Sequence, residues 1–298
     1  MLLCTNEPKS ELQSSRYIGE RNGWGMLKLI DYSPLYGKTW WVWEVDKCGG
    51  VQGIINTCKA TGARGAVVKA FDGVNTWPQW EQSVYTLKAA GLVVGAWGYV
   101  YPANIDQTAQ AALAALEKAD YLIIDAESEF ETSGTAAHQL GDLIRAKVPD
   151  ALIGLTTFAL PELHSSFPYS TFLVWTDFIA PQVYWADAQM GAADMLNQSL
   201  DQLQKLSKKP IYPVAQGYPQ ALPSEMAEFG ATAVNRWVGG LSFWDIQSTT
   251  QDIKDSVKLV ETYRPKQGVH NPVDKMWTTS EFNAALDSAI KTLEGYKK

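Results

Sequence analysis

The sequence predicts an α/β chain folded as a (β/α)8 barrel of the TIM type, and three observations lead to this prediction. Short apolar runs alternate with helix-like segments over about 225 residues. Polar and aromatic side chains gather where the apolar runs end, as they do at the mouth of a parallel barrel. The chain has 298 residues, 46% of them hydrophobic, which is enough to fill one large core. A doubly wound sheet is the alternative, but eight regular units favour closure.

Three segments are predicted along the chain. Residues 1–38 are mixed and polar, and they are expected to form an N-terminal extension or a lid over the barrel. Residues 39–263 form the barrel itself. Residues 264–298 begin as a linker containing Pro and Gly and end in an amphipathic C-terminal helix. That helix is expected to pack back on the barrel, with docking or oligomer formation as the alternative.

The eight strands are predicted where β-branched and other apolar residues form short runs bounded by turn signals. These runs lie at residues 40–46, 66–71, 93–99, 121–127, 152–157, 178–185, 211–216 and 241–245. Longer segments between them predict helices at residues 51–60, 76–90, 106–119, 133–148, 188–206, 224–239 and 252–263. The second helix has Pro78 in its first turn and Gly91 after its last, as helix termini prefer.

The fourth strand ends in two acids, in the run Tyr121-Leu-Ile-Ile-Asp125-Ala-Glu127. Side chains alternate along a strand, so Asp125 and Glu127 are expected on one face, with Cα atoms roughly 6–7 Å apart. The carboxyl ends of parallel strands carry the chemistry of such barrels. Two carboxylates this close cannot ionise independently, so one of them is a candidate for a raised pKa and for acid catalysis.

The other strand ends add amides, aromatic rings and further acids. The residues expected around the mouth, besides that pair, are Asp46, Asp72, Trp97, Tyr99, Gln182, Tyr184, Trp185, Gln216, Tyr218, Trp244 and Asp245. Acids and stacking surfaces, without a Gly-rich phosphate loop or a metal cluster, indicate glycoside hydrolysis. Lys69 is expected to form a structural ion pair with a neighbouring acid.

The stretches 65–73, 87–97 and 124–127 resemble glycoside hydrolase family 25, the lysozymes of bacteria and phages. That family has an Asp at the end of its first strand and an Asp-x-Glu at the end of its fourth. Trp43-Glu-Val-Asp46 and Asp125-Ala-Glu127 occupy those places. The usual family 25 opening, Asp-Val-Ser with a nearby Gln-Gly, is absent.

The second half of the barrel resembles family 18 chitinase-like barrels instead. Ala180-Pro-Gln-Val-Tyr-Trp and Gly239-Gly-Leu-Ser-Phe-Trp are similar to strands six and eight of that family. Family 18 also carries an Asp-x-Glu after strand four, within the longer signature Asp-x-x-Asp-x-Asp-x-Glu, which is incomplete here. The chain therefore resembles the wider group of lysozyme-like and chitinase-like barrels.

This resemblance implies a glycosidase that cleaves a β-linked N-acetylated glycan, with peptidoglycan as the leading case. Glu127 would be the acid, and Asp125 would orient an N-acetyl group that attacks in a substrate-assisted, retaining mechanism. Tyr184 would hydrogen-bond the same group, and Asp46 and Gln182 would hold hydroxyls or tune Glu127. Three Trp side chains would be sugar platforms, although each could equally be core: Trp97, Trp185 and Trp244.

The alternative function is a non-catalytic barrel that binds a glycan or serves in assembly, because a fold alone does not establish activity. The N-terminal extension and the C-terminal helix keep this alternative open, since added ends often dock other proteins. Trp244 and Asp245 are neighbours on one strand, so only one of them is expected to point inward.

Charge and composition limit the kinds of partner and cofactor that the protein is expected to bind. The net charge of −7 argues against nucleic acid or an anionic membrane as partner. No apolar run reaches the length of a membrane span, and the first residues have no signal-peptide pattern. Action outside the cell, at a cell wall or by a phage-encoded protein, is still expected, because the chain could be a mature form or leave its host by a route that uses no signal. Three Cys and three His predict neither a zinc site nor a cofactor site, and a Cys48–Cys58 disulfide is left open.

Overall fold

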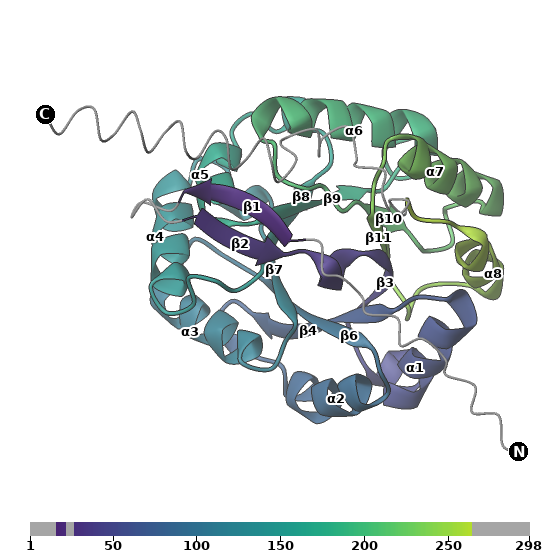
Figure 1. The fold of residues 1–298 in the computed structure, drawn as a ribbon, viewed down its shortest axis with the longest axis horizontal. Coiled ribbons are helices and arrows are strands. Elements are labelled where there is room, and N and C mark those ends of the chain that lie inside the picture. Colours follow the sequence, from purple (N-terminus) through teal and green to yellow (C-terminus); the bar gives the residue numbers. More distant parts are fainter. Residues whose placement is uncertain (1–15, 22–26, 264–298) are drawn as a thin grey trace, which may run out of the picture. The chain divides into compact units, whose positions relative to one another are not determined.

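The computed structural model describes residues 16–21 and 27–263, and eight parallel strands within them close into a barrel (Figure 1). The barrel strands are β3 (Gly37–Val42), β4 (Gly65–Asp72), β6 (Val93–Tyr99), β7 (Tyr121–Asp125), β8 (Ile153–Phe158), β9 (Phe178–Val183), β10 (Val214–Gln216) and β11 (Gly240–Trp244). β3 pairs with both β11 and β4, which closes the sheet. The short β5 (Asn75–Thr76) pairs antiparallel with β4 outside this ring. The predicted (β/α)8 barrel is confirmed.

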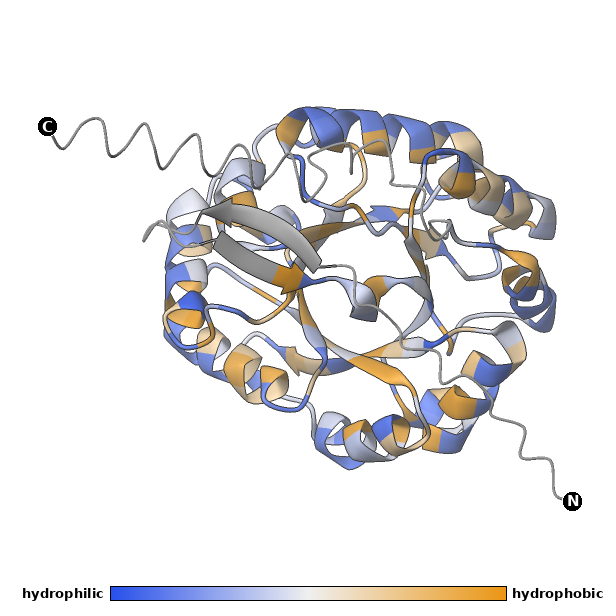
Figure 2. Ribbon diagram, viewed as in Figure 1, coloured by the Kyte–Doolittle hydropathy of each residue, from blue (hydrophilic) through white to orange (hydrophobic). Residues whose placement is uncertain are grey.

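A ring of helices surrounds the barrel strands. These helices are α1 (Gly50–Thr61), α2 (Pro78–Ala89), α3 (Ile105–Leu116), α4 (Gly134–Arg145), α5 (Tyr169–Trp175), α6 (Ala192–Leu206), α7 (Pro223–Asn235) and α8 (Gln251–Leu259). Figure 2 shows apolar residues along the strands, while polar residues colour much of the outer helix surfaces. This is the pattern of an amphipathic helix packed on a buried parallel sheet.

The barrel interior is filled in layers of side chains. Tyr121, Phe178 and Tyr212 pack edge to face in the lower layer, with ring centroids 6.2 Å and 5.8 Å apart. Gly154 makes room for them, since a Cβ atom there would lie 2.2 Å from the Phe178 ring. Larger rings form the next layer, in which Trp41, Trp97 and Trp244 make three mutual contacts at 5.3–5.7 Å.

The described residues directly before β3 cover the end of the barrel where the strands begin. A hairpin of β1 (Arg16–Arg21) and β2 (Leu27–Asp31) leads into the 3-10 turn η1 (Ser33–Leu35). Leu35 is 6% exposed and lines a small apolar cavity in the barrel interior together with Tyr121 and Phe178. The covered end is therefore opposite to the mouth that carries the predicted site.

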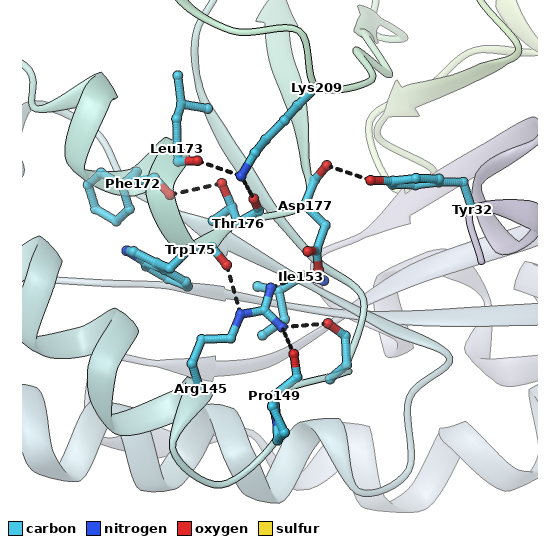
Figure 3. A network of polar contacts seen from close by, with 11 residues as sticks. Tyr32, Arg145, Pro149, Ile153, Phe172, Leu173, Trp175, Thr176, Asp177 and Lys209 are labelled. Atoms are coloured by element: carbon cyan, nitrogen blue, oxygen red, sulfur yellow. Dashed lines mark hydrogen bonds and ion pairs between the residues drawn. The ribbon is translucent and has the colours of Figure 1, made fainter. Parts of the chain in front are cut away.

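Arg145, at the end of α4, ties together the loops at this lower end (Figure 3). Its guanidinium donates to the carbonyls of Trp175 at 2.8 Å and Ala151 at 2.7 Å. It also forms an ion pair with Asp177 at 2.7 Å, and only 7% of that Asp side chain is exposed. The Asp177 carboxylate accepts from the Ile153 backbone N–H at 2.9 Å as well. The side chain of Arg145 thus joins α4 to the starts of β8 and β9.

The structure corrects several predicted bounds and adds one helix; the predicted strands 121–127 and 178–185 end earlier, at Asp125 and Val183. The first predicted strand, residues 40–46, begins and ends earlier, because β3 covers Gly37–Val42. The predicted strand at 211–216 is reduced to Val214–Gln216, since Pro213 has no N–H to donate to a ladder. A helix that the sequence did not predict, α5, lies between β8 and β9.

Part of the predicted N-terminal extension, residues 1–15 and 22–26, lies outside the described residues. The predicted C-terminal helix within residues 264–298 lies wholly outside them. None of the helices in the described ranges is both long and apolar enough to cross a bilayer.

Cys48 and Cys58 are free, so the disulfide left open by the sequence is not formed. Burial raises the pKa of both thiols to about 12.

Candidate functional site

The two acids that end the fourth barrel strand lie next to each other at the mouth. Asp125 is the last residue of β7 and is 6% exposed, whereas Glu127 lies two residues beyond the strand and is half-buried. Gln182 on β9 donates its side-chain amide to both carboxylates, at 3.2 Å to Asp125 and 2.8 Å to Glu127. One amide NH₂ carries two donors, so a single side chain holds both acids in position.

Burial and the neighbouring Glu127 carboxylate raise the pKa of Asp125 well above its usual range. The nearby Lys69 ammonium opposes this shift, and Asp72 adds to it. The sequence argument placed the proton of the pair on Glu127, but the structure places the perturbed pKa on Asp125. The physical reason is burial, because Asp125 lies within the barrel and Glu127 lies beyond the strand end.

The raised pKa of Asp125 predicts that the stability of the fold depends on pH, and Asp125→Asn should remove this dependence. Between the unfolded pKa of Asp, about 3.9, and the raised folded pKa, the native state binds more protons than the unfolded state. The free energy of unfolding of the parent should therefore fall as pH rises through this window, by up to about 1.4 kcal/mol per pH unit. Urea unfolding from acid to neutral pH should show the Asn variant gaining stability relative to the parent. A constant difference between the two across this range would contradict the assignment.

Lys69 on β4 is buried beside the acids and is held by an aromatic enclosure. Its Nζ atom lies 2.6 Å from Asp72 Oδ2, which confirms the predicted structural ion pair. The same ammonium lies over three indole rings, at 4.4 Å from Trp77, 4.9 Å from Trp97 and 5.5 Å from Trp43. Cation–π attraction strengthens when the cation is desolvated, and Lys69 is only 4% exposed.

Tyrosines line two sides of the mouth. Tyr99 donates to Glu129 at 2.6 Å, and burial together with that carboxylate raises the pKa of its phenol. On the other side the rings of Tyr184 and Tyr218 meet edge to face with centroids 5.8 Å apart. Burial also raises the pKa of Tyr184 well above its usual range, so its phenol stays protonated and can donate a hydrogen bond.

The loop after β9 is held by Gln216, which is fully buried. Its side-chain oxygen accepts from the Ala186 backbone N–H at 2.8 Å, and its amide donates to Asp187 at 3.4 Å. Tyr218 donates to the same Asp187 carboxylate. Gln216 thus supports the loop that carries Tyr184, and it has little surface left for a ligand.

Tyr218 and Trp244 share a hollow with Pro219, Gln220 and Ser248. Trp244 points inward from β11, where it contacts Trp97, while the next residue, Asp245, follows the strand and is fully buried. One oxygen of Asp245 accepts from the Ser248 N–H at 3.1 Å, and burial raises the pKa of this carboxyl. Trp244 is therefore available to a ligand and Asp245 is not.

Three predicted site residues are not placed to hold a sugar at the acid pair, one because it lies in a loop beyond its strand and two because they are buried. Asp46 is exposed in the 3-10 turn η2 (Asp46–Cys48), four residues beyond the end of β3. Trp185 is fully buried, stacks on Phe229 at 5.4 Å and donates to Glu225, so it has no face for a sugar. Trp97 is also core, at 2% exposure.

The structure adds residues that the sequence argument did not select. Those around the mouth are Trp43, Trp77, Tyr101, Glu129 and Asp187. All of them follow strand ends by one to five residues, so counting the first loop residues after each strand would have found them. Among the described residues, no group of His, Cys, Asp and Glu side chains has the arrangement to hold a metal ion.

No protein-family model matches the chain, and no curated protein matches its sequence. Solved structures do match. Active domain 2 of a chitinase from Pyrococcus furiosus superimposes with a TM-score of 0.58 at 12% identity, covering 75% of this chain and 96% of that one. The ICChI chitinase from Ipomoea carnea gives 0.54 at 12% identity, covering 74% and 98%. A family 18 N-acetylglucosaminidase from Paenibacillus barengoltzii gives 0.53 at 8% identity, covering 76% and 100%.

The structural similarity to these three proteins shows which fold the chain has. The barrel is of the kind found in chitinases and family 18 glycoside hydrolases, in agreement with the resemblance of its second half. The family 25 lysozyme resemblance of the first half is not shown by them.

Proposed function

We propose that the protein is a glycoside hydrolase that cleaves a β-linked N-acetylated glycan at the mouth of the barrel. The observation that carries this proposal is the pair Asp125 and Glu127, held by the one amide of Gln182 at the carboxyl ends of β7 and β9. Two carboxyl groups on the reacting face are the minimum that such hydrolysis needs.

In the proposed mechanism Glu127 gives its proton to the glycosidic oxygen while the bond from that oxygen to the anomeric carbon breaks. The acetamido oxygen of the substrate attacks the same carbon, so the intermediate is a cyclic oxazolinium and no bond to the protein forms. The Asp125 carboxylate would accept from the acetamido N–H and balance the positive charge, and Tyr184 would donate to the acetamido group. Water then opens the ring and returns its proton to Glu127, with retention at the anomeric carbon.

The raised pKa of Asp125 supplies the resting state of this scheme. In the proposed resting state the pair shares one proton, because burial and the Glu127 carboxylate both favour the protonated form of Asp125. A substrate N–H placed at Asp125 favours its ionised form, which moves the proton toward Glu127. Asp46, the third predicted catalytic acid, has no part in this scheme because it is exposed in η2.

The charges at the mouth bear on the choice between peptidoglycan, the case favoured by the sequence, and a chitin-type polymer. Around the pair lie the further acids Glu129 and Asp187, while Lys69 is already paired with Asp72. Excess negative charge disfavours ligands that carry carboxylates, as the stem peptides of peptidoglycan do. We therefore expect faster hydrolysis of soluble chito-oligosaccharides than of peptidoglycan, measured as reducing ends released at equal sugar concentration. Release from peptidoglycan alone would overturn this preference.

One observation favours the alternative, a glycan-binding barrel without activity. Ile123, only 3% exposed, occupies the place of the second acid in the family 18 signature, so the pair has an apolar side chain beneath it. Binding of chito-oligosaccharides with no release of reducing ends at any pH between 4 and 8 would replace the enzyme by this alternative.

A further inference from the structure

Lys69 lies one level below the acid pair inside the barrel. In the parallel register, Lys69 on β4 lies at the level of Ile123 on β7, two strands away. Asp72 and Asp125, on the same two strands, share the next level toward the mouth. The long side chain of Lys69 rises from its own level, and its Nζ atom ends 2.6 Å from Asp72 Oδ2. Its positive charge therefore lies between the two levels, beneath the acids of the mouth.

The ammonium of Lys69 is held in one place. Its side chain is 5% exposed, and three indole rings enclose the Nζ atom at 4.4–5.5 Å from their centroids: Trp43, Trp77 and Trp97. The backbone is tied as well, because the Lys69 carbonyl accepts from the Gln79 amide at 3.2 Å. A lysine stem is flexible when it is exposed, whereas here the surrounding rings order it. The positive charge thus keeps a constant place relative to the acids.

Stability alone does not explain a charged side chain at this position. Well-packed apolar side chains that replace a buried ion pair often leave the free energy of unfolding unchanged or raise it. Asp72 has a second partner, since its Oδ1 atom accepts from Tyr101 at 3.0 Å, and its side chain is 29% exposed. Asp125 is only 6% exposed, so water screens it less from the charge of Lys69. The charge is therefore placed to act on the buried acid of the pair.

We propose that Lys69 is a positioning residue that acts through its charge and sets the pH at which the acid pair enters its reactive state. This inference rests on the proposed function, in which Asp125 is ionised and Glu127 protonated when the glycan reacts. The ammonium lowers the pKa of Asp125, against burial and the Glu127 carboxylate, which raise it. The side chain beneath the pair, Ile123, is apolar, so the charge that balances the pair comes from the neighbouring strand β4 instead.

The groups that face Asp125 from the other strands are neutral. Tyr99 on β6 and Tyr184 on β9 have raised pKa values, so both phenols stay protonated. Gln182 on β9 is an uncharged amide that donates to both acids of the pair. Lys69 supplies from β4 a positive charge that these neighbours do not. Its removal should therefore change the ionisation of Asp125 directly.

The test is a carbon-13 NMR titration of the full chain, labelled at the aspartate carboxyl carbons, with the Asp125 signal assigned by its absence from Asp125→Asn. Lys69→Met keeps most of the side-chain volume but removes the positive charge, so the midpoint of Asp125 should rise by about one pH unit or more. Asp72→Asn removes a negative charge that raises the pKa of Asp125, so the midpoint should fall. This second variant keeps the ammonium, and it decides the question if Lys69→Met is poorly folded.

Lys88→Met is the matched control. Lys88 forms an ion pair with Asp120 at 2.9 Å, and the two side chains are 33% and 32% exposed. Asp120 directly precedes β7, so this pair lies at the opposite end of the strand that Asp125 ends. The variant changes the net charge as Lys69→Met does, but it should leave the midpoint of Asp125 unchanged.

Hydrolysis of chito-oligosaccharides gives a second measurement. The acid limb of the pH profile of kcat/KM reports ionisation in the free enzyme, so it should move up in Lys69→Met and down in Asp72→Asn. NMR midpoints that stay in place, or that move in the same direction in both variants, would overturn the role of Lys69 while the proposed function stands. Opposed midpoints in a protein that cleaves no such sugar would overturn the proposed function and leave the effect of Lys69 on Asp125 in place.

Discussion

Replacing Glu127 with glutamine is expected to lower the rate of glycan hydrolysis by about 10²- to 10⁴-fold, the usual contribution of a general acid. Glutamine keeps the size of the side chain, but it cannot deliver a proton to the leaving oxygen. Oligosaccharide affinity should persist, because the rings that line the mouth are unchanged. Initial rates of reducing-end release, with affinity measured in parallel, separate the two effects.

Two comparisons make this expectation specific. Asp125→Asn should also lower the rate. The two losses should not add, so the double variant should be faster than the sum of the two changes in activation free energy predicts, because both acids serve one transition state. Glu228→Gln is the matched control, since Glu228 is exposed on α7. Full activity of Glu127→Gln would remove Glu127 from the mechanism.

Replacing Arg145 with methionine is expected to destabilise the fold by about 3–5 kcal/mol, the cost of removing one partner of a buried ion pair. Arg145 and Asp177 are 17% and 7% exposed at their side chains, and the guanidinium also donates to the carbonyls of Trp175 and Ala151. Methionine fills much of the volume but supplies none of these donors. Chemical denaturation followed by far-UV circular dichroism would measure the change.

Arg236→Met is the control for this stability effect. Arg236 forms an ion pair with Asp201 at 2.6 Å, but the Asp201 side chain is 61% exposed. Exposed pairs of this kind contribute about 0–1 kcal/mol because solvent screens them. Similar losses in both variants would show that burial is not what makes the Arg145 pair important.

The barrel and the acid pair could be predicted from the sequence because both depend on local patterns. The apolar run of β7 ends at Asp125, and alternation along the strand places that carboxyl inside the barrel. The same rule excludes Trp185, since it follows the inward-facing Tyr184 and must face the helices. Its assignment as a sugar platform was wrong for a reason already present in the sequence.

Other features depend on residues distant in the chain and could not be predicted. β3 ends at Val42 because the following backbone turns to the side chains of Gln247 and Gln79, which accept from the N–H groups of Glu44 and Val45. Asp46 is thereby carried away from the acids. Likewise α5 is rich in aromatic and β-branched residues, which favour strands, and its packing in the core decides for a helix.

The four indoles Trp41, Trp43, Trp97 and Trp244 have ring centroids 5.3–6.2 Å apart where they touch. Their excited states must couple at such separations, because transition dipoles interact strongly over a few ångströms. The cluster spans the ends of three strands that meet only when the barrel closes. The protein therefore carries an intrinsic optical reporter: an exciton couplet in its ultraviolet circular dichroism would follow barrel closure without any added label.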